Sequence, residues 1–139
     1  MVPIMSVGRV LVVDDQPEIR QTVRLLLGRK GYEVIEAEDG EQAIATLESG
    51  DNPEKVVLVI CDLIMPKGSG LEMTTYVRSH HPSIPVIVVS GSGDAQTVAS
   101  VLKQGAVEYL TKPAEPAQLI AAVQKAVKDR LQSNDQSAM

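Results

Sequence analysis

Side chains capable of metal and phosphate chemistry follow apolar segments of this 139-residue chain. They are Asp14, Asp15, Asp62, Ser90 and Lys112. Carboxylates about 5 Å apart repel each other by roughly 3 kcal/mol at an effective dielectric of about 20, so three together require a compensating cation. Hard oxygen ligands with room for water favour Mg²⁺. Mg²⁺ beside a lysine and a hydroxyl would bind a phosphoryl group, and an aspartate could be the nucleophile that forms an acyl phosphate.

The apolar segments that precede these side chains have the length and composition of buried strands. Five strands are predicted, at Val10–Val13, Glu33–Ala37, Val56–Cys61, Val86–Ser90 and Val107–Leu110. Five helices are predicted between and after them, at Pro17–Lys30, Gly40–Ser49, Gly70–His81, Asp94–Gln104 and Glu115–Arg130. Strict alternation with short connections predicts parallel strands joined by right-handed crossovers. The expected fold class is therefore α/β, a three-layer doubly wound five-stranded parallel sheet with helices on both faces.

The pattern of each strand indicates its place in this sheet. Val56–Cys61 and Val86–Val89 are the most continuously apolar and are predicted to be central, whereas Glu33–Glu36 alternates and suits a strand nearer the edge. In a doubly wound sheet the loops after the strands meet at one edge. We therefore expect the three carboxylates, the hydroxyl and the ammonium to converge there.

Most of these residues, taken singly, also have a purely structural interpretation. Asp14 or Asp15 alone could cap the following helix, and Ser90 could be a turn residue. Tyr109 could be a half-buried strand aromatic, and Cys61, the single cysteine, is most simply a core residue. The convergence of reactive groups at predicted strand ends favours the chemical interpretation.

Composition argues against several classes of function. The chain is 44% apolar and 22% charged, with a net charge of −5 and no basic cluster longer than Arg29-Lys30, which argues against direct nucleic-acid binding. One cysteine allows no internal disulfide, and a reducing, cytoplasmic location fits. No apolar stretch is long enough for a membrane span, and the first residues lack the features of a signal peptide.

Four motifs occur in order, each at a predicted strand end. They are Asp14-Asp15, Asp62 with Met65-Pro66, Ser90-Gly91, and Gly105-Ala106 with Tyr109-Leu110-Thr111-Lys112-Pro113. Together they resemble the receiver domains of bacterial two-component response regulators. The resemblance predicts a receiver domain over residues 9–130, with flexible termini at residues 1–8 and 131–139. It implies a flavodoxin-like (α/β)5 fold with strand order 2-1-3-4-5.

The resemblance also implies roles for individual residues. Asp62 would be the phosphoacceptor, taking a phosphoryl group from a phosphohistidine of a sensor histidine kinase or a phosphotransfer protein. Lys112, aimed by a cis bond before Pro113, would pair with the phosphoryl oxygens, and Ser90 would hydrogen-bond the phosphoryl group. Tyr109 matches the family's switch aromatic, which turns inward when Ser90 moves. Such a domain promotes only its own phosphorylation and dephosphorylation and is not otherwise an enzyme.

Mg²⁺ is the cofactor that the resemblance implies. Asp14 would hold it through water and Asp15 directly, while Asp62 and the backbone carbonyl of Ile64 would complete the protein ligands. Ile64 and Ser92 occupy the two positions that modulate access of water to the acyl phosphate in the family.

The expected function is a phosphorylation-dependent signalling switch in a phosphorelay. Phosphorylation would change the surface formed by Asp94–Gln104, Val107–Leu110 and Glu115–Arg130. A partner protein or output domain would read that surface, which could also form a homodimer. The alternative is a Mg²⁺-dependent hydrolase of the haloacid dehalogenase type, but that family places Asp-x-Asp after the first strand, where this chain has Asp14-Asp15-Gln16. A flavin-binding protein is disfavoured because the acidic pair would repel the flavin phosphate.

Overall fold

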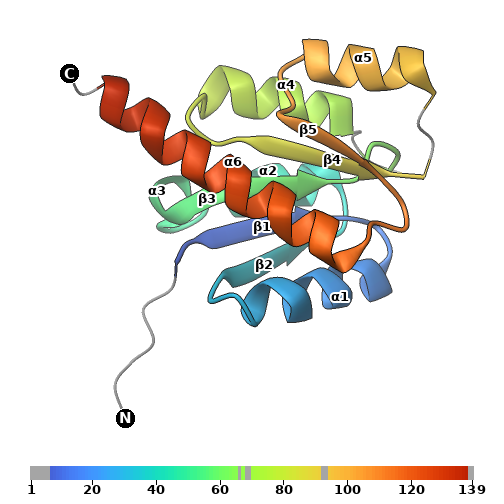
Figure 1. The fold of residues 1–139 in the computed structure, drawn as a ribbon, viewed down its shortest axis with the longest axis horizontal. Coiled ribbons are helices and arrows are strands. Elements are labelled where there is room, and N and C mark those ends of the chain that lie inside the picture. Colours follow the sequence, from blue (N-terminus) through green and yellow to red (C-terminus); the bar gives the residue numbers. More distant parts are fainter. Residues whose placement is uncertain (1–6, 66, 68–69, 92–93, 138–139) are drawn as a thin grey trace.

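The computed structural model describes residues 7–65, 67, 70–91 and 94–137 (Figure 1). In this part of the chain strands and helices follow one another in the order β1 (Arg9–Val13), α1 (Pro17–Gly28), β2 (Glu33–Ala37), α2 (Gly40–Leu47), α3 (Asn52–Lys55), β3 (Val56–Cys61), α4 (Gly70–His80), β4 (Val86–Ser90), α5 (Ala95–Lys103), β5 (Glu108–Thr111) and α6 (Pro116–Ser137). None of these helices has the length and apolarity that crossing a membrane would require.

The five strands form one parallel sheet in the order β2-β1-β3-β4-β5. The predicted α/β class and strand order are thereby confirmed. β3 is the central strand, as its unbroken apolar run predicted, and β2 lies at one edge. The chain runs from β1 to β2, reverses, and then runs through β3, β4 and β5, and its helices lie on both faces of the sheet.

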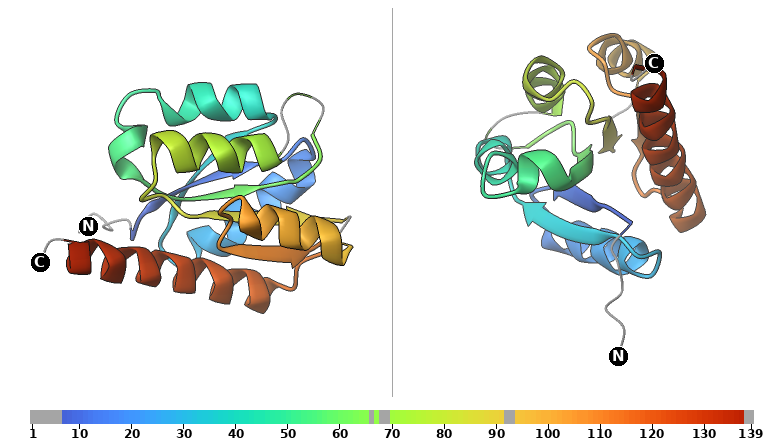
Figure 2. Two further views of the ribbon diagram at one scale, coloured as in Figure 1. Left: turned by 90° about the horizontal axis from the view of Figure 1, so that it is seen from above. Right: turned by 90° about the vertical axis from the view of Figure 1, so that its left-hand side faces the viewer.

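Alternation of side chains along the strands builds two cores, one on each face of the sheet. Val10 and Val12 of β1 belong to the core under α1 and α6. Leu11 and Val13 belong to the opposite core, under α2, α4 and α5. The views agree, since α2 and α4 lie side by side over one face while α6 crosses the other (Figure 2).

The structure differs from the sequence prediction at two helices. α3, a single turn over Asn52–Lys55, was not predicted, because four residues are too few to show a helical period. The last helix was predicted to end at Arg130 but continues through Ser137. Neither glycine nor proline occurs between these two residues, so the sequence carries no stop signal there.

Some sequence predictions fall on residues outside the described ranges. These are most of the predicted N-terminal segment (residues 1–6), Pro66, Ser92, and residues 138–139. By contrast, Asp94, where the predicted helix Asp94–Gln104 begins, is within them and caps α5. Asp94 accepts a hydrogen bond of 2.7 Å from the backbone N–H of Thr97.

Gly105 provides a test of the backbone after α5. Its φ is +118°, and a Cβ there would lie 2.7 Å from Cδ of Arg78. We expect Gly105→Ala to lower the free energy of unfolding by about 1–3 kcal/mol, chiefly through backbone strain. Gly28→Ala is the control, since a Cβ at Gly28 meets nothing within 4 Å. This substitution should stabilise by about 0.5–1 kcal/mol. Urea unfolding measures the free energy of unfolding of both variants. A Gly105→Ala variant as stable as the wild type would show that a side chain at this position causes no strain.

Candidate functional site

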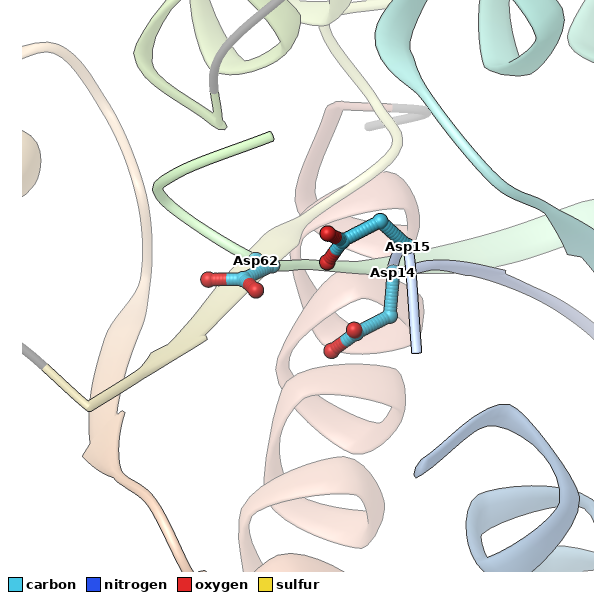
Figure 3. A group of neighbouring side chains, drawn as sticks. All are labelled: Asp14, Asp15 and Asp62. Carbon is cyan, nitrogen blue, oxygen red and sulfur yellow. The ribbon is translucent and has the colours of Figure 1, made fainter. Parts of the chain in front are cut away.

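The register of β1 with β3 brings the acidic side chains together. Val13 is paired with Cys61, and the backbone N–H of Asp62 donates to the carbonyl of Val13 at 2.9 Å. The residues that follow the pair therefore leave the sheet side by side. Carboxylate oxygens of Asp14, Asp15 and Asp62 lie within 4.8 Å of one another (Figure 3). The predicted convergence of the three carboxylates is thus present.

The register of β4 with β5 places the hydroxyl and the ammonium at the same edge. Ser90 is paired with Thr111, and the backbone N–H of Lys112 donates to the carbonyl of Ser90 at 3.0 Å. The Lys112–Pro113 peptide bond is cis. Nζ of Lys112 lies 2.8 Å from Oδ2 of Asp14 and 2.9 Å from Oδ2 of Asp62. One ammonium thus bridges two strand ends.

Burial governs the electrostatics of this edge. Asp14 is only 3% exposed, and this burial raises the pKa of its carboxyl above 3.8, although hydrogen bonds from Lys112 and Gln16 oppose the shift. Burial also acts to lower the pKa of Lys112, but the two aspartates together outweigh it and the net pKa is raised. Lys112 therefore stays protonated and offsets one of the three carboxylate charges. The ionised cluster keeps an excess of negative charge.

Two further residues, Gln16 and Arg20, make contacts at the site that were not predicted from the sequence. Gln16 accepts a hydrogen bond of 3.2 Å from Nζ of Lys112 and donates its backbone N–H to Oδ1 of Asp14 at 2.9 Å. Arg20 donates to the backbone carbonyl of Asp14 at 2.7 Å and to the Glu36 carboxylate at 2.9 Å. The sequence shows Arg20 one turn into a helix, yet nothing in it reveals that Glu36 lies opposite.

The remaining predicted residues lie around this cluster. Ile64 is 64% exposed, and its backbone N–H donates to Oδ1 of Asp62 at 3.3 Å. Ser90 is buried, and Tyr109 is half-buried and packs against the core under α2, α4 and α5. The structure places Ile64 and Ser90 beside the acidic edge, and Tyr109 two pairs back along β5 from Thr111.

The donor set fits a hard divalent cation. Three carboxylates within reach of one another, two of them buried, supply anionic oxygen and leave one side open through the exposed Asp15. Mg²⁺ accepts one or two carboxylates and keeps several waters. The neighbouring ammonium of Lys112 would add positive charge for a phosphate group without contacting the ion. The edge can therefore bind a cation and a phosphoryl group together.

Comparison with known proteins gives concordant matches. A family model for the response regulator receiver domain matches residues 10–124. The chain is 33% identical over 126 residues to the response regulator protein PilR of Pseudomonas aeruginosa. It is 34% identical over 125 residues to the phosphate regulon transcriptional regulatory protein PhoB of Escherichia coli. A response regulator receiver domain protein from Clostridium thermocellum superposes with a TM-score of 0.84 at 30% identity.

Coverage differs between the chains that match. The alignment with PilR covers 91% of this chain but 27% of PilR, and that with PhoB covers 88% of this chain and 52% of PhoB. The chain thus spans about a quarter to a half of the length of these curated relatives. The Clostridium thermocellum structure is matched over 91% of this chain and 98% of its own length.

The raised pKa of Asp14 leads to a stability prediction. In metal-free buffer at neutral pH the ionised Asp14 destabilises the folded state, so Asp14→Asn should raise the free energy of unfolding. As the pH falls through the folded-state pKa toward 3.8, wild-type Asp14 takes up its proton and the advantage of the variant should shrink. Urea unfolding across this pH range measures the difference.

Asp39→Asn is the matched control for that experiment. Asp39 caps α2 by accepting from the backbone N–H of Gln42 at 2.8 Å. Asparagine caps helices as well as aspartate does, so this variant should stay within about 0.5 kcal/mol of the wild type at neutral pH. An Asp14→Asn variant less stable than wild type at neutral pH would show that the ion pair with Lys112 outweighs burial.

Proposed function

Because the chain belongs to the response regulator receiver domain family, we propose that it is a phosphorylation-dependent signalling switch whose phosphoacceptor is Asp62. One observation carries the assignment of this residue. Asp62 ends the central strand, its carboxylate lies 2.9 Å from the Lys112 ammonium, and it shares an oxygen cluster with Asp14 and Asp15. A carboxylate oxygen of Asp62 would attack phosphorus, the P–N bond of a phosphohistidine would break, and the imidazole would leave.

Mg²⁺ is the cofactor that the donor set favours. Asp15 and Asp62 would bind it directly with the backbone carbonyl of Ile64, and Asp14 would bind it through water. When bound, the ion would neutralise charge on the cluster and on the phosphoryl oxygens. Arg20 and Gln16 hold Asp14 in place. Arg20 donates to the backbone carbonyl of Asp14, and the backbone N–H of Gln16 donates to its carboxylate.

Lys112 and Ser90 would stabilise the phosphorylated state. The Lys112 ammonium contacts the Asp62 carboxylate in the structure. After phosphorylation it would pair with the phosphoryl oxygens, which carry more negative charge than the carboxylate. The Ser90 hydroxyl would hydrogen-bond the phosphoryl group, and Tyr109, which is paired with Val88 on the neighbouring strand, would turn inward with it. The two residues lie on adjacent strands, so a shift at one reaches the other through β4 and β5.

The surface of α5, β5 and α6 is the proposed output. It exposes apolar side chains, with Leu102 42% and Val107 49% accessible. PhoB carries a transcriptional regulatory name, and we propose an output of that kind, delivered by a further domain or by a separate partner. Homodimerisation through this surface and a cytoplasmic location stay predictions. The kinase or phosphotransfer protein would dock over the acidic edge, beside the exposed Asp15.

Phosphorylation by a small donor tests the acceptor. With acetyl phosphate and MgCl₂, we expect the wild type to gain the mass of one phosphoryl group, labile in alkali as an acyl phosphate is, and Asp62→Asn to gain none. Asp39→Asn removes a half-buried carboxylate outside the acidic cluster and should be phosphorylated like the wild type. Intact-protein mass spectrometry reads all three. Undiminished phosphorylation of Asp62→Asn would overturn the assignment, and rapid turnover of many phosphoesters would favour the dehalogenase-type hydrolase.

Metal binding is tested separately from phosphorylation. MgCl₂ should raise the thermal midpoint of the wild type, because a ligand that binds the folded state stabilises it. Asp15→Asn removes one anionic ligand and should weaken Mg²⁺ binding at least about tenfold. NaCl at matched ionic strength is the control for screening of the carboxylates. Equal Mg²⁺ affinity in the wild type and Asp15→Asn would exclude Asp15 as a ligand.

A further inference from the structure

A crevice of about 240 Å³ lies between α1 and the beginning of α6 and opens at the acidic edge. Its walls are apolar side chains from both helices, the sheet and the loop before α6: Ile19, Val23, Leu26, Val89, Ala114 and Leu119. Its polar end is formed by Asp14, Asp62 and Lys112, with Thr22 on the α1 side. The phosphoryl chemistry proposed above uses the polar end and leaves the apolar part without a role.

We propose that this crevice binds a small cationic amphiphile, a molecule with an apolar body and an ammonium or guanidinium head. The body would lie between α1 and α6, and the head would lie against the carboxylates of Asp14 and Asp62. The inference goes beyond the proposed function and does not depend on it, because binding is a property of the unphosphorylated, metal-free chain.

The volume sets the size of the ligand. An apolar cavity of roughly 150 Å³ holds a benzene molecule. A crevice of about 240 Å³ therefore has room for one ring and a tether of two or three atoms. That tether would carry the head from the apolar walls toward the acidic edge. Larger amphiphiles would have to extend past Thr22, which is exposed at the rim.

The charged groups that line the crevice determine whether the ligand's head should be cationic or anionic. Lys112 is the one cation among the described residues that line the crevice, and its ammonium is already held by Asp14 at 2.8 Å and by Asp62 at 2.9 Å. With Asp15 in the same cluster, three carboxylates face one ammonium. An anionic head would meet this excess of negative charge, whereas a cationic head would reduce it.

Loose packing alone is the competing explanation of the crevice. Protein interiors are normally packed as closely as organic crystals, and this chain has no phenylalanine or tryptophan to fill a wide gap. A packing gap would bind ligands without regard to the charge of the head and would be unconnected to metal binding. The two explanations therefore differ in charge selectivity and in competition with Mg²⁺.

Phenethylamine is the probe, compared with 3-phenylpropionate and 2-phenylethanol, which carry an anionic and a neutral head on the same body. Titration of the metal-free full chain is followed by ¹³C-methyl NMR. We expect the amine to shift the methyl signals of Ile19, Leu26 and Leu119, with a dissociation constant on the order of 1 mM for so small a ligand. Binding should be at least about tenfold weaker for the carboxylate. MgCl₂ should weaken binding of the amine.

Two variants fill the crevice from opposite walls. Ala114→Leu, from the loop before α6, and Thr22→Leu, from α1, should each weaken amine binding at least about tenfold, because the added atoms occupy the volume of the ring. If one of them fails to fold, the other provides the same test. Leu25→Ala is the control. Leu25 is 55% exposed on α1 and does not line the crevice, so amine binding should be unchanged.

Three results would overturn the inference. The first is methyl shifts confined to residues outside the crevice, or none at all. The second is equal binding of the carboxylate and the amine, which would leave only a packing gap. The third is amine binding that survives MgCl₂ or both filled variants. Loss of phosphorylation in Asp62→Asn bears on none of these, so the two proposals fail independently.

Discussion

The excess of negative charge at the strand ends is the constraint on which the site depends, and it is partly offset by the ion pairs of Lys112 with Asp14 and Asp62 at 2.8 and 2.9 Å. Strand register forces the three carboxylates together, because adjacent parallel strands end at the same level. Without a cation between them the strand ends would repel each other. Lys112 supplies this cation. It follows β5, and its side chain reaches across the end of β4 to the carboxylates. The fold therefore holds an excess of negative charge with only one built-in counter-charge, and this is the condition that makes a bound cation stabilising.

Rigidity around Asp62 comes from backbone packing as much as from side chains. A Cβ at Gly70 would lie 2.5 Å from the carbonyl oxygen of Asp62, so only glycine allows α4 to begin so close to the strand end. The buried hydroxyl of Thr74 donates to the Gly70 carbonyl at 2.7 Å and fixes that first turn. The backbone of Asp62 is thus held between β1 and α4. This limits the conformations open to its side chain before any ligand binds.

The sequence predicted the fold well because the information is local. The five strands are short and rich in apolar residues, with β3 an unbroken apolar run, and segments of helical period separate them, so the α/β class follows from periodicity. The strand order needed the family resemblance, since periodicity does not say which strands are neighbours. The contact of Arg20 with Glu36 and the bond from Gln16 to Lys112 could not be predicted. They depend on side-chain directions across elements, which are set only when α1 packs on the sheet.

The crevice and the excess of negative charge lie at the same edge of this domain. The core is built of aliphatic side chains, and the central parts of the strands are fully buried. Close packing ends where α1 and α6 approach the carboxyl ends of the strands, and the crevice opens there, beside the carboxylates. A cation that enters this region relieves repulsion, and an apolar group that enters it fills space. Any molecule that did both would stabilise the folded state by an amount that rises with the logarithm of its concentration once that concentration exceeds the dissociation constant. By the same linkage, its head and a metal ion would compete for the same carboxylates, so the proposed crevice site and the proposed metal site would be coupled.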